Sequence, residues 1–278
     1  MFEHLRSAVS GEGETSEPEP ARRPRCDVGL VGALAMELAG LEDLLSGKIA
    51  TRGPEFVVHS GRLGDRGLAL VAGGIGRANA ERATWALLQG HQPAWVISAG
   101  FAGALREGLR HGDIVMADSL VTPSGERLAI DLKVSREALT ATPGLHVGRL
   151  LTVDRVVAKS ADKRKLGETH DALAVDMETY AVAELCRREK VRFMAVRVIS
   201  DTVDEELPAD IGRVAQQRTL VGTLGAVTGA VWRRPASFKD MLRLKQQALI
   251  ASDRLARFLE GTIAQLPRAT PVSTERTS

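Results

Sequence analysis

Short apolar runs recur along the middle of the chain and predict buried β-strands. Each run ends at glycine or at polar residues, as expected of strands inside a sheet. The runs span Val28–Leu34, Phe56–Leu63, Leu68–Val71, Trp95–Ser98, Asp113–Val121, His146–Val153 and Val191–Ile199. Arg127–Val134 differs, because apolar and polar residues alternate strictly along it, which predicts a half-exposed strand.

Residues at helical spacing follow several of these runs. The predicted helices cover residues 36–45, Arg77–Gly90, Glu178–Lys190 and most of Ile211–Leu266. Pro235 lies inside the last range, and we expect it to separate two long helices because proline interrupts helical hydrogen bonding.

Strands that alternate with helices indicate an α/β fold. Several strands adjoin without a helix between them, so we predict a single-domain mixed, twisted sheet flanked by helices, with a C-terminal helical extension. Residues 1–26 and 267–278 are rich in polar residues, and the long N-terminal stretch also in Gly and Pro, which predicts disordered tails. The α/β domain is expected over residues 27–234 and the extension over residues 235–266.

Composition narrows the class of protein. The chain of 278 residues is 44% hydrophobic and 26% charged, with a formal net charge of +2, which fits a globular protein and predicts no nucleic-acid partner. Cys26 and Cys186 make no disulfide framework, and the histidines are scattered, so we expect no metal and no cofactor. No run reaches the roughly 18–20 apolar residues of a membrane span. We therefore expect a cytoplasmic protein.

Unusual residues gather where the predicted strands end, which is where ligands bind in α/β folds. The segments are Gly32–Glu37, Gly73–Arg77, Ala99–Gly103, Val175–Glu178 and Ile199–Asp204. The glycine-rich segment Gly73–Arg77 has two interpretations. It is either a plain turn or a loop whose N–H groups bind an anion or a ribose. A dinucleotide-binding site would also carry an acidic residue about 20 residues after its glycines. No such residue stands there, so NAD binding is not predicted.

Three blocks in this order resemble the methylthioadenosine/S-adenosylhomocysteine nucleosidases of the nucleoside phosphorylase superfamily. They read VGLVGALAMEL at 28–38, LVAGGIGRANAERATWALLQGHQPAWVISAGFAGALREGLRHGDIVMAD at 70–118 and AVDMETYAVAELCRREKVRFMAVRVISDTVDEE at 174–206. Together they cover about a third of the chain. The resemblance implies a mixed-sheet α/β sandwich, a nucleoside substrate and a homodimer.

The resemblance also implies roles for three carboxylates. Glu37 falls on the group that activates water, Glu178 on a ribose-binding residue and Asp201 on the acid that protonates the leaving base. The implied binding and supporting residues are Met177, Arg197, Ser200, Gly76, Gly100, Phe101, Val156 and Val157.

The chemistry explains why these residue types are needed. Cleavage of the N-glycosidic bond leaves a poor purine anion and a cationic ribosyl centre, so an acid must protonate the base, and burial would help Asp201 to retain that proton. The charge of Glu178 would favour the cationic centre. Arg197 lies on an apolar strand and needs a carboxylate partner, for which we expect Glu178.

Each candidate also has a purely structural interpretation. Glu37 and Glu178 could stabilise helix N-termini through the helix dipole, and Asp201 could be an N-cap. Met177 could be an ordinary core residue.

Some residues depart from the pattern of the superfamily. Phe101 stands where phosphorolytic relatives carry a small polar residue, and Glu37 stands near the place of their phosphate-binding Arg, which favours water as the nucleophile. Arg77 leaves phosphorolysis open. The segment between Asp118 and His146 is shorter than in typical nucleosidases, so the 5′ group of the substrate is not defined.

The C-terminal helices are similar to the ends of hopanoid-associated phosphorylases, which act on an adenosyl lipid. An apolar stripe there indicates packing on the protein's own domain or, alternatively, a partner or membrane surface. Its members are Phe238, Met241, Leu242, Leu249, Leu255 and Phe258.

Three functions follow. The first is hydrolysis of an adenine nucleoside of the 5′-methylthioadenosine/S-adenosylhomocysteine type, as in methionine salvage. The second is phosphorolysis of a purine nucleoside or an adenosyl lipid, and the third is nucleoside binding without catalysis.

Overall fold

The computed structural model describes residues 26–131, 141–207 and 235–267. The elements are β1 (Val28–Gly32), α1 (Ala35–Asp43), β2 (Ser46–Arg52), β3 (Val57–Leu63), β4 (Arg66–Ala72), α2 (Arg77–His91), β5 (Trp95–Ala104), β6 (Ile114–Val121), β7 (Arg127–Ala129), β8 (Leu145–Thr152), α4 (Ser160–His170), β9 (Ala174–Asp176), α5 (Thr179–Arg188), β10 (Arg192–Asp201) and α7 (Pro235–Gln265).

The strands form one mixed sheet that closes on itself at one end. β10 pairs with both β5 and β6, β6 pairs with β8, β8 with β9 and β9 with β5, so these five strands complete a ring. β1, β4, β3 and β2 extend from β5 as an open arm. The prediction of a mixed, twisted sheet flanked by helices is confirmed, and the closure adds a small distorted barrel.

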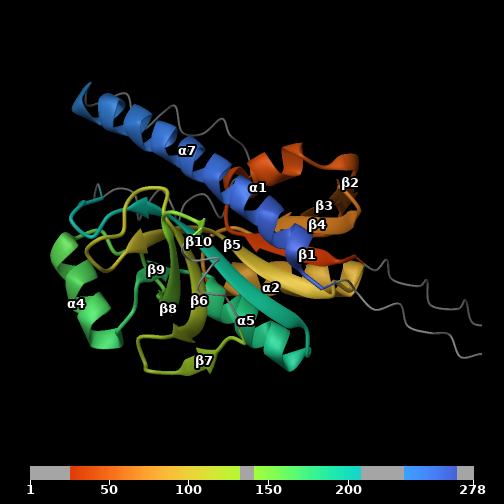
Figure 1. Cartoon of the computed structure of the whole chain (residues 1–278), viewed down its shortest axis with the longest axis horizontal. Coiled ribbons are helices and arrows are strands. Elements are labelled where there is room, and N and C mark those ends of the chain that lie inside the picture. Colours follow the sequence, from red (N-terminus) through yellow and green to blue (C-terminus); the bar gives the residue numbers. More distant parts are fainter. Residues whose placement is uncertain (1–25, 132–140, 208–234, 268–278) are drawn as a thin grey trace, which may run out of the picture.

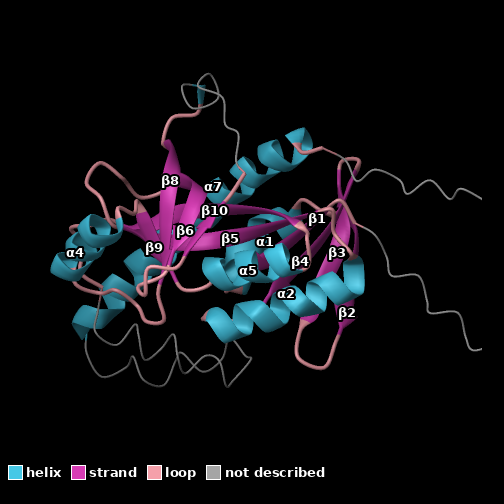
Figure 2. Cartoon of the chain, turned by 90° about the horizontal axis from the view of Figure 1, so that it is seen from below, coloured by secondary structure: helices cyan, strands magenta, loops and turns pink. Residues whose placement is uncertain are grey.

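Helices cover both faces of the sheet around β1, β5 and β10 (Figure 1). α1 and α7 lie on one side of the strands, and α2 and α5 lie on the other, as Figure 2 also shows. The pleat sends alternate side chains to the two sides. Leu30 of β1 packs in the same cluster as Leu255 of α7, whereas its neighbour Val31 packs with Leu87 of α2. Both faces are therefore apolar, which explains why the strands are continuous apolar runs.

The C-terminal helix α7 packs on the α/β domain. Leu255, Leu259 and Ile263 are fully buried at helical spacing. The Arg66 side chain donates hydrogen bonds to the carbonyls of Ala264 and Leu266, at 3.2 and 2.5 Å. This part of the helix therefore belongs to the core.

Only part of the expected apolar stripe on α7 packs against the core. Leu255 is buried and Phe258 packs partly against the core, but Leu249 is 52% exposed, so it does not belong to the packed face. Phe238, Met241 and Leu242 lie outside the residues whose side chains the structure describes. No helix in the described part of the chain is long and apolar enough to cross a membrane.

Other differences from the sequence predictions have local causes. β7 ends at Ala129, so Ile130 is not in the strand, while Leu132 and Val134 lie outside the described residues. β2 was not predicted, because every residue in it is exposed and no apolar alternation marks it. Pro235 begins α7, and the helix expected before it falls in residues 208–234, which the structure does not describe.

Candidate active site

Glu37 lies in the first turn of α1, with its carboxylate turned back toward the sheet. One oxygen, Oε2, accepts hydrogen bonds from the backbone N–H groups of Ala33 and Leu34, both at 2.8 Å. The other, Oε1, accepts one from the N–H of Phe101 in β5, at 2.9 Å. A Cβ on Gly100 would lie 2.8 Å from Oε1, so only glycine permits this approach. Glu37 thus caps α1 and also joins it to β5.

Burial controls the protonation of Glu37. The side chain is 5% exposed, and loss of solvent raises the pKa of its carboxyl. The three backbone N–H groups and the charge of Arg197 act in the opposite direction without cancelling this effect. A carboxylate with a raised pKa is a stronger base than a free glutamate, which suits proton abstraction from water.

Arg197 is paired with Asp176 rather than with Glu178, so the expected partner was wrong. Its guanidinium lies 2.7–2.9 Å from Oδ2 of Asp176, and both side chains are almost wholly buried. The remaining donors reach Ser98, Thr179 and the carbonyl of Val196. Arg197 is therefore occupied within the protein and acts on the site through its charge, rather than by direct binding.

Asp176 ends β9 and holds the start of α5. Its Oδ1 accepts a hydrogen bond from the Thr152 hydroxyl at 2.7 Å, and its Oδ2 accepts from the backbone and hydroxyl of Thr179 as well as from Arg197. Asp176 lies within the VDME segment, but nothing in the sequence distinguishes it from Glu178 as the partner of Arg197.

Glu178 lies two residues after the end of β9 and is the N-cap residue of α5. It accepts hydrogen bonds from the N–H of Gly76, at 2.7 Å, and of Met177, at 3.2 Å. Burial first, and then the charge of Asp176, raise the pKa of Glu178 to about 8. The raised pKa favours the neutral, protonated form of Glu178, whereas the sequence predicts a charged group at this position.

Two polar centres can be distinguished, the first formed by Glu37, Asp176, Glu178 and Arg197. Asp201, which ends β10, forms the second with Lys163 and Ser200. Its Oδ2 lies 2.5 Å from the ammonium of Lys163, and its Oδ1 accepts a hydrogen bond from the Ser200 hydroxyl at 2.7 Å. A Cβ on Gly103 would lie 2.9 Å from Oδ2. Lys163 has no exposed surface, and the sequence does not predict this, because a lysine in the polar helix SADKRKLGETH carries no signal of burial.

One stretch of β5 links the two polar centres. Gly100 lies against Glu37 and Gly103 against Asp201. Three residues of a strand span about 10 Å. The strand β10 runs parallel to this stretch, with Arg197 opposite Gly100 and Asp201 opposite Gly103. A ligand lying along this stretch of β5 would meet Glu37 near one end and Asp201 near the other.

The predicted apolar contacts lie close to the segment that carries Glu178. Met177 and Val157 pack against one cluster that includes Val153 and Val175. Val156 precedes Val157 in the loop after β8 and is also partly buried.

The glycine-rich turn is largely occupied by the protein itself. The N–H groups of Gly73 and Gly74 donate to the carbonyls of Gly32 and Ala33, both at 2.9 Å, and that of Gly76 donates to Glu178. Arg77 lies over the ring of Tyr180, with 5.6 Å between the guanidinium carbon and the ring centre. The turn therefore joins the end of β1 to the segment that carries Glu178.

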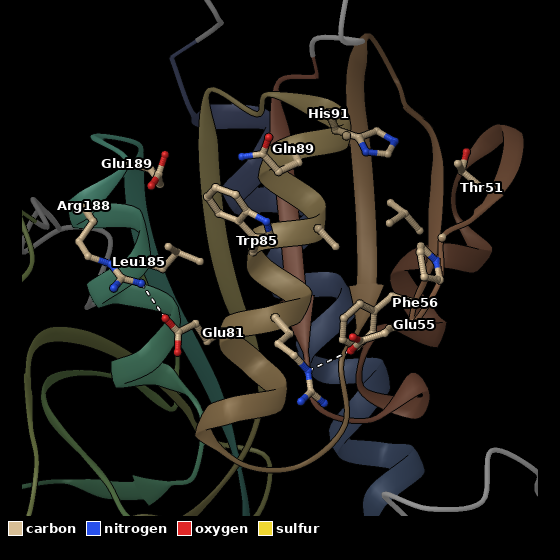
Figure 3. Close-up of a pocket in the computed structure, with 16 residues that line it drawn as sticks. Thr51, Glu55, Phe56, Glu81, Trp85, Gln89, His91, Leu185, Arg188 and Glu189 are labelled. Atoms are coloured by element: carbon tan, nitrogen blue, oxygen red, sulfur yellow. Dashed lines mark hydrogen bonds and ion pairs between the residues drawn. The ribbon is translucent and has the colours of Figure 1, made fainter.

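A shallow hollow lies elsewhere, between α2, α5 and the loop before β3 (Figure 3). Phe56, Trp85, His91 and Leu185 contribute to its wall, and Trp85 is 48% exposed. None of Glu37, Glu178 and Asp201 lines this hollow, so it is separate from the polar centres. Among the described residues, no group of His, Cys, Asp or Glu is arranged to hold a metal ion.

Comparisons with known proteins agree with this architecture. The 5′-methylthioadenosine/S-adenosylhomocysteine nucleosidase of Haemophilus influenzae (strain 86-028NP) is 30% identical over 200 residues, which cover 64% of this chain and 86% of the relative. That of an Exiguobacterium species is 27% identical over 201 residues, with the same coverage.

Two solved Helicobacter pylori structures share the fold. The 5′-methylthioadenosine/S-adenosylhomocysteine nucleosidase, in complex with a substituted pyrrolidin-3-ol, has a TM-score of 0.66 at 18% identity and covers 88% of this chain and 100% of its own. The futalosine hydrolase also has a TM-score of 0.66 at 18% identity, over 87% of this chain and 98% of its own. The Phosphorylase superfamily model matches residues 27–221, and the chain belongs to this superfamily.

Proposed function

We propose that the protein hydrolyses the N-glycosidic bond of an adenine nucleoside of the 5′-methylthioadenosine/S-adenosylhomocysteine type and releases adenine. The observation that carries the proposal is the carboxylate of Glu37 bound by three backbone N–H groups. The relatives named above support the class of substrate.

These contacts favour water over phosphate as the nucleophile. N–H groups at a helix N-terminus are a ready site for an anion, but here the protein's own carboxylate fills it. A second anion beside Glu37 would be repelled by about 4 kcal/mol per unit charge at 4 Å and an effective dielectric constant near 20. The raised pKa of Glu37 also suits it to accept a proton from water.

The reaction then needs one base, one acid and a ribose contact. Water adds to C1′ and gives a proton to Glu37, while the C1′–N9 bond breaks and its electron pair passes to the purine. Asp201 donates the proton that makes the purine a neutral leaving group. Glu178 hydrogen-bonds the ribose hydroxyls, Met177 supplies an apolar wall for the sugar, and Val157 lies toward the base.

Proton exchange with solvent restores the two catalytic carboxyl groups. Glu37 loses the proton that it took from water, and Asp201 regains the one that it gave. The products are adenine and the 5′-substituted ribose.

Phosphorolysis of a purine nucleoside or an adenosyl lipid is the second candidate. Arg77 favours it, because this cation is only partly buried and lies beside the glycine-rich turn.

We also propose that the protein works in the cytoplasm as a homodimer. Sedimentation velocity of the purified full chain tests the dimer, because it measures the mass of the particle in solution.

A purine-release assay tests the substrate class. Methylthioadenosine, S-adenosylhomocysteine, adenosine, inosine and futalosine are compared at equal concentrations, with the Glu37→Gln protein as background. We expect adenine to be released fastest from the two 5′-thio-substituted nucleosides. Release of purine from none of the five would overturn the proposed function, and a preference for futalosine or inosine would overturn the substrate class.

A further inference from the structure

The side chain of Lys163 is the largest one in the described chain that is wholly buried. It comes from α4 and reaches the end of β10, where its ammonium has three acceptors. These are Oδ2 of Asp201, at 2.5 Å, and the carbonyl oxygens of Thr202 and Glu205, both at 2.8 Å. An ammonium has three donors, so all of them are used. A buried ammonium is costly unless acceptors surround it in this way.

We propose that Lys163 is a positioning residue for nucleoside cleavage. It holds Asp201 so that the transferable proton lies on Oδ1, and it stabilises the negative charge that Asp201 acquires when the proton passes to the leaving base. This inference rests on the proposed function, and it assigns to α4 a part in catalysis.

The geometry at the two carboxyl oxygens distinguishes their roles. An ammonium offers donors and no acceptor, so Oδ2 can only accept from Lys163 and cannot hold the proton toward it. Oδ1 faces the hydroxyl of Ser200, which lies 2.7 Å from Oδ1 and 3.3 Å from the carbonyl oxygen of Ala102. The single hydroxyl hydrogen of Ser200 can turn to either oxygen. It donates to Ala102 while Asp201 is protonated, and to Oδ1 once the proton has left.

Charge development gives the pair its effect on rate. In the state in which Asp201 carries the proton that it donates, its side chain is neutral and gains little from Lys163. As the proton moves to the purine, Asp201 becomes an anion 2.5 Å from a fixed cation in a buried place. An interaction that strengthens in the transition state lowers the barrier rather than only tightening binding.

Lys163 also binds two carbonyl groups of the loop after β10. The test must therefore separate a role in holding this loop from the role proposed in catalysis. Glu205 provides the comparison, since its carboxylate accepts a hydrogen bond from the N–H of Thr202 at 2.9 Å and pairs with His111. Glu205→Gln weakens this loop, yet it leaves the contact between Lys163 and Asp201 in place.

Two substrates with different leaving groups provide the test. Methylthioadenosine needs a proton on its base, whereas 4-nitrophenyl β-D-riboside releases a stable phenolate without one. For Lys163→Met, we expect kcat for methylthioadenosine to fall by about 10–10²-fold, part of the 10²–10⁴ typical of a general acid. KM and the rate with the nitrophenyl riboside should change by less than about 3-fold, well below that range. Lys163→Gln, which keeps a donor without the charge, should behave in the same way if Lys163→Met does not fold.

The controls make the outcomes distinct. Asp201→Asn should show the same selective loss, and Glu205→Gln should affect both substrates equally or neither. An equal loss on both substrates for Lys163→Met, or a selective loss for Glu205→Gln, would overturn the role of Lys163. If Asp201→Asn itself spares methylthioadenosine, the acid in the proposed function is wrong, which is a separate result. Thermal unfolding of each variant confirms that it is folded.

Discussion

The two polar centres beside β5 balance their charge differently. At the Gly100 end, the carboxyl groups of Glu37, Asp176 and Glu178 share the single guanidinium of Arg197. At the Gly103 end, one carboxylate faces one ammonium, Asp201 against Lys163. The first centre carries more acid than cation, and the second is balanced.

This difference decides what each centre can do. At the first centre, burial raises the pKa of Glu37, and burial together with the charge of Asp176 raises that of Glu178, while the carboxyl groups repel an incoming anion. At the second centre, Asp201 would become an anion beside the ammonium of Lys163 once it has donated its proton. A nucleoside placed along β5 would therefore meet base chemistry at its ribose and acid chemistry at its purine.

Removal of Glu37 should have the largest effect. We expect Glu37→Ala to lower purine release by about 10³–10⁴-fold, the upper range for general base catalysis. The N–H groups of Ala33, Leu34 and Phe101 remain, so added formate should occupy the space and restore part of the rate. Steady-state assays with and without formate measure this.

Glu37→Gln is the matched control for rescue. Its amide fills the same space, so formate should not increase its rate. Rescue of both variants, or of neither, would contradict the view that these three N–H groups hold the base.

The pair formed by Arg197 and Asp176 should matter most for stability. Arg197→Met leaves a buried carboxylate without its cation, and we expect the free energy of unfolding to fall by about 3–5 kcal/mol. Arg188 and Glu81 form an exposed pair at 2.6 Å, so Arg188→Met should cost less than about 1 kcal/mol. Urea unfolding that gives similar losses for the two variants would argue against a structural centre at Arg197.

Asp201→Asn should separate folding from catalysis. Asparagine keeps the shape but cannot donate a proton as an acid, so we expect purine release to fall by at least about 10²-fold. The variant should remain folded at the assay temperature, although loss of the charged partner of Lys163 should lower its melting temperature. Turnover close to that of the unmodified protein would show that Asp201 is not the acid.

Glu178 should make stability depend on pH. Its pKa of about 8 in the folded chain lies above the 4.5 of an unperturbed glutamate, so the folded state binds the extra proton between these values. Rising pH therefore removes stability, by about 2 kcal/mol between pH 6 and 8 from this group. Glu178→Gln should lack that loss, and parallel pH profiles of the two proteins in urea unfolding would contradict it.

The sequence was informative where burial and resemblance coincide. The strands were predicted because both faces of the sheet are covered, which leaves continuous apolar runs. Glu37 and Asp201 were placed at strand ends because the glycines and acids stand out there, and the structure brings each against a glycine of β5.

The rest depends on contacts between distant segments. Asp176 and Glu178 are only two residues apart in the sequence. Asp176 is the one that pairs with Arg197, and it is set beside Thr152 by the pairing of β9 with β8. Lys163 lies 38 residues from Asp201 and looks like any lysine of a polar helix. Closure of the barrel likewise follows from the β5–β10 pairing, which no local pattern marks.

The product formed in the presence of phosphate tests the central claim most directly. Methylthioadenosine is incubated with the purified protein over a range of phosphate concentrations, and the products are followed by adenine release and by ³¹P NMR. Because Glu37 occupies the three N–H groups, we predict a rate independent of phosphate and a free 5′-substituted ribose. A ribose 1-phosphate product whose rate of formation saturates with phosphate would contradict the account and would point to Arg77.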